Sequence, residues 1–260
     1  MAPTHPTGVA GTRFRVAHVG EVSSTNTVVT EAAMRGEPEG LVVVADHQTA
    51  GRGRLGRSWV APPGSGLLTS ILLRPPPAAL HLAVTAVGCA AAVACRRLTG
   101  VEPGLKWPND LVVADGSGWR KLGGILAEAS SAGGDVTAVV VGLGLNLRRP
   151  ADLPADLAAS AVAMDALTED PPARDAVLEA LLTELEPRYA GLISGGSPAL
   201  LDEYRARCVT LGQWVRVEQS QGAFEGVAVE VDDAAALVVD RGARGRSRVE
   251  FGDVVHLRQA

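Results

Sequence analysis

The chain has 260 residues, of which 47% are hydrophobic and 20% are charged. These fractions suit a globular protein with a sizeable core and exclude collagen, coiled coils, disulfide-stapled miniproteins and intrinsically disordered chains. The formal net charge of −5 gives no global attraction to nucleic acid or to anionic membranes, so any polyanion site has to be local. The 30 glycines exceed the usual share of about 7%, which indicates many turns or a site built from backbone.

Cysteines and histidines give no sign of a disulfide framework or a zinc site. The three cysteines, Cys89, Cys95 and Cys208, lie far apart in the sequence, and no pair of the five histidines has metal-binding spacing. Residues 1–16 contain no apolar stretch like that of a secretory signal peptide. We therefore expect a cytoplasmic protein with reduced cysteines and with no metal ion held by protein groups alone.

The first four-fifths of the chain alternates helical and β-branched segments. Serine or threonine caps, glycine stops and proline breaks set the boundaries of these segments. In chain order, the pattern predicts a helix over 22–36, a strand over 41–45, an irregular loop over 51–56, a strand over 67–74, a helix over 78–95, strands over 105–107, 111–114, 121–129 and 136–141, and helices over 155–167, 173–193 and 200–207. This alternation indicates an α/β domain.

The helix predicted over 78–95 is the one segment of membrane-spanning length. His81 and Thr85 interrupt its apolar run, and Arg96 and Arg97 follow its end, where cations favour a helix C-terminus. A buried core helix explains this composition better than a membrane span does.

The pattern of residue types in the sequence changes after Cys208. Short β-branched segments alternate there with Gly-rich and Asp-rich turns, which indicates a small antiparallel barrel. The predicted strands cover 214–218, 223–231, 237–240 and 249–257. We therefore divide the chain into a larger domain, residues 1–208, and a β-barrel domain, residues 209–260.

The densest functional signal is the sequence GRGRLGRSW at 51–59. Its three arginines and no acids give +3 within a chain of net charge −5. Glycines let a backbone approach an anion and donate N–H groups, and guanidinium groups match phosphate or carboxylate bidentately. The segment matches neither the Walker loop nor a convincing dinucleotide fingerprint. It is therefore either a polyphosphate-binding loop or, on its own, a solvated arginine-rich loop.

Three further segments combine polar residues with glycine or proline. They are KWPND at 106–110, KLGGIL at 121–126 and GLGLN at 142–146. Each also has a purely structural interpretation: a β-turn for the first, a surface lysine before a strand for the second and a bulged strand end for the third. The four segments together are more informative than any one alone.

Read in order, with Ser24-Thr25-Asn26 ahead of them, these segments resemble the biotin protein ligases. The resemblance covers residues 18–147 by motif and 148–260 by layout. It implies an α/β (α+β) fold of the class II synthetase and biotin-lipoyl ligase type. In that fold an SH2-like catalytic domain, with helices on one side of a mixed, mostly antiparallel sheet, precedes a small SH3-like β-barrel.

The resemblance also implies a two-step reaction with ATP, biotin and Mg²⁺. ATP adenylates the biotin carboxylate to biotinyl-5′-AMP with release of pyrophosphate, and a lysine of a biotin carboxyl carrier domain then attacks the mixed anhydride. A carboxylate is a poor electrophile, and two anions must first be brought together. Local cations would offset that repulsion.

Matching the family's motifs position by position implies a set of site residues. The implied catalytic residues are Lys121, Arg54 and Arg52. The implied biotin-binding residues are Ser24, Thr25, Asn26, Gln48, Gly51, Arg52, Gly53, Arg54, Lys121, Gly123 and Gly124. The implied ATP-binding residues are Arg52, Arg54, Arg57, Trp59, Lys106, Asn109, Asp110 and Asn146. Mg²⁺ would enter with ATP, with Asp110 as one candidate ligand, and the loop over 51–59 is expected to be mobile until ligand closes it.

Other interpretations of the sequence remain open. A lipoate–protein ligase would share the fold, the barrel and the basic loop could belong to a nucleic-acid-binding module, and an α/β domain could keep the architecture without the activity. Ser24-Thr25-Asn26 lies too near the start of this sequence for a preceding helix-turn-helix, so we expect a ligase without repressor activity. Its expected partner is the carrier domain, with no nucleic acid and no membrane, and the expected state is a monomer or weak homodimer.

Overall fold

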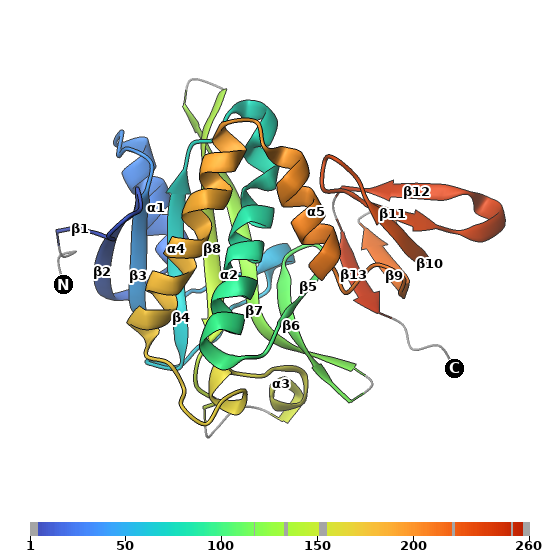
Figure 1. The fold of residues 1–260 in the computed structure, drawn as a ribbon, viewed down its shortest axis with the longest axis horizontal. Helices are drawn as coiled ribbons and strands as arrows, with labels where there is room; N and C mark the ends of the chain where they lie inside the picture. The colour runs from blue at the N-terminus through green and yellow to red at the C-terminus, as the bar shows by residue number, and fades with distance from the viewer. Residues whose placement is uncertain are drawn as a thin grey trace.

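The computed structural model describes residues 5–116, 118–132, 135–150, 155–219, 222–250 and 252–256. An eight-stranded sheet forms the larger part of the molecule, in the order β1-β2-β3-β4-β8-β7-β6-β5 (Figure 1). Its strands are β1 Thr7–Gly8, β2 Arg15–Val22, β3 Leu41–Gln48, β4 Gly66–Leu73, β5 Gly104–Lys106, β6 Asp110–Asp115, β7 Gly118–Ala132 and β8 Asp135–Asn146. Only β2 and β3 pair in parallel among the described strands of this sheet, so it is mixed and mostly antiparallel.

Helices cover both faces of this sheet. The helices are α1 Thr25–Met34, α2 Ala83–Thr99, α3 Ala155–Ser160, α4 Arg174–Ile193 and α5 Ser197–Arg207, with 3₁₀ turns η1 Arg54–Gly56, η2 Pro77–Leu82, η3 Met164–Ala166 and η4 Gly242–Arg244. Along β3, Val42 and Val44 face the core under α2 and α4, whereas Val43 and Ala45 face the core under α1. The prediction of helices on one side was wrong, because the run at 41–45 of β3 is apolar at every position and needs cover on both faces.

The alanine-rich segment forms the buried helix α2. It packs on the sheet beside α4 (Figure 1), and a Cβ at Gly88 would already lie 3.4 Å from Ile125 and 3.6 Å from Leu105. The described residues contain one helix of membrane-spanning length and composition, Pro77–Thr99, and 72% of its most apolar window is buried. The core-helix interpretation is therefore confirmed.

The three cysteines are free and buried. Burial raises the pKa values of Cys89 and Cys95 to about 12. Their thiols are therefore protonated at neutral pH and act as small apolar groups of the core.

Several elements differ from the prediction. Strand β2 was missed, and the helix predicted from residue 22 begins at Thr25. The helix predicted over 155–167 ends at Ser160, because Ala161 leaves it to form a parallel bridge with Lys121 on β7. These tertiary contacts leave no local signature in the sequence.

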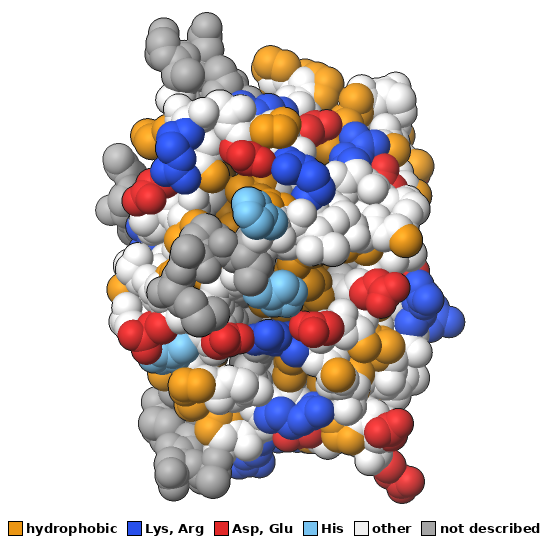
Figure 2. All heavy atoms as spheres, turned by 90° about the vertical axis from the view of Figure 1, so that its left-hand side faces the viewer, with side chains coloured by type: hydrophobic (Ala, Val, Ile, Leu, Met, Phe, Trp, Pro, Cys, Tyr) orange, Lys and Arg blue, Asp and Glu red, His pale blue; other side chains and the backbone are white. Residues whose placement is uncertain are grey.

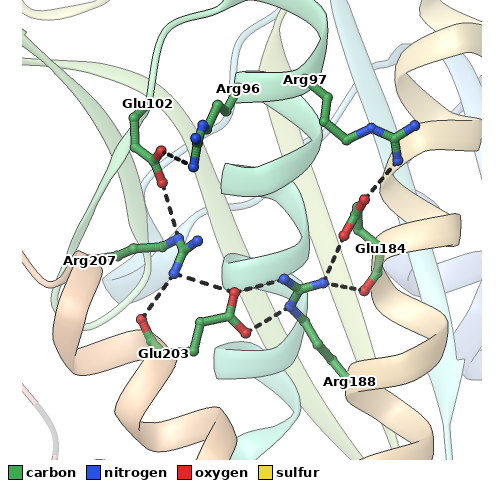
Figure 3. A network of polar contacts seen from close by, with 7 residues as sticks. All are labelled: Arg96, Arg97, Glu102, Glu184, Arg188, Glu203 and Arg207. Atoms are coloured by element: carbon green, nitrogen blue, oxygen red, sulfur yellow. Dashed lines mark hydrogen bonds and ion pairs between the residues drawn. The ribbon is translucent and has the colours of Figure 1, made fainter.

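Arginine and glutamate side chains tie α2, α4 and α5 together (Figure 3). Glu203 of α5 accepts two hydrogen bonds from Arg188 of α4, at 2.7 and 3.0 Å, and lies 3.4 Å from Arg207. Arg188 also pairs with Glu184 at 3.1 Å, and Arg97 of α2 reaches the same glutamate at 2.7 Å. The network fixes α5, whose end leads into the barrel.

Glu203→Ala should lower the free energy of unfolding by about 1–3 kcal/mol, because two half-buried guanidinium groups lose a charged hydrogen-bond acceptor. Urea denaturation followed by circular dichroism measures this change. Glu179→Ala, which removes an exposed acid of α4, is the matched control and should cost less than about 0.5 kcal/mol. Equal losses of unfolding free energy in the two variants would show that the network does not contribute to the stability of the fold.

The second sheet has the strand order β12-β11-β10-β9-β13 and lies beyond α5 (Figure 1). Its strands are β9 Trp214–Gln219, β10 Gly222–Val231, β11 Leu237–Asp240, β12 Arg246–Val249 and β13 Asp253–His256. The strand predicted over 249–257 is thus two strands, and its last residue, Leu257, lies outside the described residues.

Hydrogen bonds join this barrel to the KWPND segment. Trp107 donates its backbone N–H to Thr210 Oγ1 at 3.0 Å and its indole N–H to the carbonyl of Ala235 at 2.9 Å. The backbone N–H of Val209 also bonds to the carbonyl of Leu105 at 3.0 Å. On the face of the molecule turned away from the barrel, charges of both signs are interspersed (Figure 2).

We expect His256 to make the stability of the barrel depend on pH. Its Nε2 lies 3.1 Å from Thr210 Oγ1, and burial, with a smaller contribution from Lys106, lowers the pKa of His256 to about 4. Its ordinary pKa is about 6.5, so the unfolded state binds more protons between these two values. Stability should be full above pH 6.5 or so and should fall by about 1–2 kcal/mol as the pH approaches 4, allowing for partial exposure of the ring.

Urea midpoints of the wild type and of His256→Gln at several pH values between about 7 and 4 test this expectation. The variant should show the shallower fall of stability with pH. Equal slopes for the two proteins would assign the acid sensitivity to other groups.

Candidate functional site

A cleft opens on the α1 face of the large sheet, at the N-terminus of α1. The loop over 51–59 and the neighbouring ends of β6, β7 and β8 form its walls, and Asp253 reaches it from the barrel. Most of the predicted site residues line it: Ser24, Thr25, Asn26, Gln48, Arg52, Gly53, Arg54, Arg57, Trp59, Asn109, Asp110, Lys121 and Gly124. The structure thus brings together residues from five separate segments of the sequence.

Gly51 and Gly123 lie outside this cleft. A Cβ at Gly51 would come within 2.5 Å of the Trp59 carbonyl, so glycine at this position lets the two ends of the loop approach each other. A Cβ at Gly123 would point to the other face of the sheet, 2.9 Å from the Leu145 side chain. The backbone of Gly123 serves the β7–β8 pairing rather than the lining of the cleft.

Lys106 and Asn146 also lie outside the lining of the cleft. Asn146 lines a second hollow, which shares Trp59 and Lys121 with the cleft, and its amide donates to the carbonyls of Lys121 and Val162 at 3.3 and 3.1 Å. Lys106 is half-buried on β5, where burial lowers its pKa against the attraction of Asp110. The two hollows adjoin at Trp59 and Lys121.

Several residues of the site were not among the predicted ones. Gly142 and Gly144 lie two apart in the GLGLN segment, a spacing that puts both on one face of β8 and that could have indicated their role. Ser70, Glu128 and Asp253 have no local signal in the sequence. The additional residues in or beside the cleft are Ser58, Thr69, Ser70, Ile125, Leu126, Glu128, Gly142, Leu143, Gly144 and Asp253.

The arginine-rich loop folds back on itself. Gly53 N–H bonds to the carbonyl of Arg57 at 2.6 Å, and Trp59 N–H bonds to the carbonyl of Gly51 at 2.9 Å. At the tip, Leu55 adopts a left-handed conformation with φ of 55°. This turn directs Arg52, Arg54 and Arg57 toward groups of the cleft; the mobility of the loop without ligand stays a prediction.

Trp59 lies flat on the glycines of β7 and β8. A Cβ at Gly144 would come within 2.4 Å of the indole, and one at Gly124 within 3.2 Å. The ammonium of Lys121 is 5.6 Å from the centre of the ring. The indole Nε1 is buried and has no hydrogen-bond partner among the described residues, so a ligand acceptor at this point would satisfy it.

In this structure, acidic or amide side chains of the protein already pair with the cations of the cleft. Lys121 Nζ lies 2.7 Å from Asp110, Arg52 lies 3.0 Å from Glu128, and Arg57 pairs with Asp253. Arg54 donates to Asn109 Oδ1 at 3.3 Å, and burial lowers its pKa, against the attraction of Asp253 and Asp110. These pairs reduce the repulsion among the four cations before a ligand binds. An anionic ligand would then replace the carboxylates with its own oxygens as partners of the cations.

The floor of the cleft is neutral and polar. Thr25, Asn26 and Ser70 are buried and connected by hydrogen bonds, with Gln48 at one end of the chain and Glu128 at the other. The cleft therefore joins a neutral, hydrogen-bonding floor to a wall of four cations. Such a site suits a ligand with an uncharged polar head and an anionic end.

No group of three or more His, Cys, Asp or Glu side chains suited to a metal ion occurs in the described ranges. Asp110 is the one predicted metal ligand, and its Oδ1 accepts the Lys121 ammonium in this state. A divalent cation at this point would take most of its ligands from phosphate and water.

Comparison with known proteins agrees with the geometry of the cleft. The biotin/lipoate A/B protein ligase family model matches residues 19–146, the segment that supplies nearly all of the lining. A biotin–[acetyl-CoA-carboxylase] ligase of Mycobacterium tuberculosis is 37% identical over 92% of this chain and 88% of its own length. The chain belongs to the biotin protein ligase family. A bifunctional ligase/repressor of Bacillus subtilis, also similar to it, is 31% identical over 84% of the chain and 67% of its own length.

Solved structures of biotin protein ligases have the same fold. That of Aquifex aeolicus, in complex with biotin and ATP, superposes with a TM-score of 0.79 at 25% identity, covering 94% of this chain and 99% of that one. The predicted family and fold class, a mixed α/β domain followed by a small SH3-like barrel, are confirmed. The lipoate ligase alternative is not favoured, because the Mycobacterium tuberculosis relative and the Aquifex aeolicus structure are both named as biotin ligases.

Proposed function

We propose that this chain activates biotin with ATP to biotinyl-5′-AMP and transfers biotin to a lysine of a biotin carboxyl carrier domain. The observation that carries this proposal is the cleft itself, where a neutral polar floor meets Arg52, Arg54, Arg57 and Lys121. Biotin has an uncharged cyclic urea at one end and a carboxylate at the other, so its two ends match the two parts of the cleft. The biotin- and ATP-bound relative supports the same assignment.

The chemistry requires two anions to meet. A biotin carboxylate oxygen attacks the α-phosphorus of ATP, the bond to the β-phosphate oxygen breaks, and pyrophosphate leaves. Positioning both substrates in one cleft removes much of the entropic cost, and fixed cations stabilise charge that develops on the leaving group. Next, the carrier amine attacks the carbonyl carbon, AMP leaves, and an amide remains.

Individual residues can be given roles in this scheme. Lys121 stands between the cleft and the second hollow, so its ammonium would bridge the biotin carboxylate and the α-phosphate. Trp59, which also borders both hollows, would contact the nucleotide and offer its unpaired Nε1. Mg²⁺ would enter with ATP and offset phosphate charge, and Asp110, which pairs with Lys121 in this structure, could help to hold it.

Mass spectrometry of a biotin carboxyl carrier domain incubated with this chain, biotin and Mg·ATP tests the function. One lysine of the carrier should gain the mass of biotin, and a carrier with that lysine replaced by arginine should gain none. Lipoate in place of biotin should give no product. An unmodified carrier, together with no biotin-dependent exchange of pyrophosphate into ATP, would refute the proposal.

A further inference from the structure

The floor of the cleft contains a hydrogen-bond chain whose direction can be assigned by counting protons. Ser70 Oγ lies 2.6 Å from both Thr25 Oγ1 and Asn26 Oδ1, and Thr25 Oγ1 lies 3.0 Å from Gln48 Oε1. At the other end, Asn26 Nδ2 lies 2.6 Å from Glu128 Oε2. Thr25, Asn26 and Ser70 are each at most 5% exposed, so an unpaired group in this chain would be costly.

The carboxylate of Glu128 sets the direction of the chain. A carboxylate and a backbone carbonyl only accept, so Asn26 must present its NH₂ group to Glu128 and to the carbonyl of Leu126, 3.3 Å away. Its amide oxygen then faces Ser70, which must donate its single proton to it. A Cβ at residue 142 would lie 2.3 Å from this amide oxygen, so Gly142 leaves the space that the orientation requires.

The same count fixes the hydroxyl of Thr25. Because the Ser70 proton is used, the 2.6 Å contact between the two hydroxyl groups needs the Thr25 proton. Gln48 Oε1 then accepts from the Thr25 backbone N–H, at 2.7 Å, rather than from the hydroxyl. Thr25 Oγ1 is left with free lone pairs at the cleft and so presents an acceptor to a ligand N–H.

We infer that Glu128 is a positioning residue which fixes the donor and acceptor pattern of the cleft floor and thereby selects a ligand with a cyclic urea. This inference rests on the proposed function and deepens it. The urea of biotin carries N–H donors and a carbonyl acceptor, whereas the dithiolane ring of lipoate carries neither. Glu128 also accepts Arg52 at 3.0 Å, so the same oxygen connects the floor to the arginine-rich loop.

Two substitutions at residue 128 separate this role from general stability. Glu128→Ala should weaken biotin binding about 10-fold or more, because Asn26 loses the acceptor that orients it. Glu128→Gln should recover most of that loss, since one amide oxygen can take the place of Oε2, which receives both donors. Calorimetric titration of biotin into the full chain measures both affinities. Glu21→Ala, an acid on β2 outside the cleft lining, is the matched control and should bind biotin like the wild type.

A double-mutant cycle tests whether Glu128 acts through Asn26. Asn26→Asp alone places two carboxylates at the 2.6 Å contact and should abolish measurable biotin binding. Combined with Glu128→Gln, the aspartate can accept from both the new amide and Ser70, and binding should return by about 10-fold or more over the single variant. Additive effects of the two substitutions would overturn the inference.

A readout in the ligand-free protein keeps the inference separate from the proposed function. The side-chain amide protons of Asn26 should exchange slowly with solvent in the wild type and in Glu128→Gln, and faster in Glu128→Ala, by nuclear magnetic resonance. If this holds while the wild type binds no biotin, the proposed function fails and the orientation stands. Identical exchange in all three proteins, or unchanged biotin binding in Glu128→Ala, would overturn the inference.

Discussion

Lys121→Ala should reduce biotin-dependent exchange of pyrophosphate into ATP by about 10²–10³-fold, the loss typical for one preorganised donor to developing charge. Lys121 borders both hollows, and its ammonium lies 2.7 Å from Asp110 and over the ring of Trp59. Removing it would leave the carboxylate and the α-phosphate without the cation between them. It would also leave Asp110 unpaired at the same place, which adds repulsion toward both substrates.

The control for this experiment is the neighbouring residue on β7. Arg120→Ala removes a cation of the same strand that pairs with Asp115 outside the cleft, at 2.9 Å. This variant should keep exchange within about 3-fold of the wild type, since its contacts do not include the substrates. If Lys121→Ala kept pyrophosphate exchange at a similar level while circular dichroism showed an intact fold, Lys121 would be excluded from the chemistry.

Much of the fold followed from local patterns. The run at 41–45 and the alanine-rich segment at 78–95 gave a strand and a buried helix, and the change of texture after Cys208 gave the second sheet. Strand β2 was not apparent, because Arg15, His18 and Glu21 interrupt its apolar residues. Its position beside β3 depends on long-range pairing rather than on local propensity.

The site divides in a similar way. Residues within the glycine-rich and KWPND segments reach the cleft because short motifs keep their spacing in the fold. Glu128 lies on β7, Ser70 on β4 and Asp253 on β13 of the second sheet, so their contribution depends on strand register and on how the two sheets pack. Gly123 shows the converse, since it lies in a motif but a Cβ there would point to the face of the sheet away from the cleft.

Arg54→Gly should convert the chain into one that releases its reactive intermediate. Arg54 is half-buried between the loop and Asn109, and it borders the cleft. Glycine at this position removes a cation and increases the conformational freedom of the loop, so the closed state that shields the anhydride from water becomes less populated. With biotin and Mg·ATP but no carrier, lysines of an added bystander protein such as serum albumin should become biotinylated at least about 10-fold faster than with the wild type.

The small number of lysines in the chain makes release of the intermediate easy to detect. Its only two lysines are Lys106 and Lys121, one half-buried and one within the cleft, so an exposed lysine of the enzyme itself cannot absorb the released intermediate. Streptavidin blots should therefore show label on albumin and little on the enzyme. Arg244→Gly, at an exposed arginine of the barrel, is the control and should label albumin no faster than the wild type does. An Arg54→Gly variant that labels albumin no faster than the wild type would show that the loop does not retain biotinyl-AMP through this side chain.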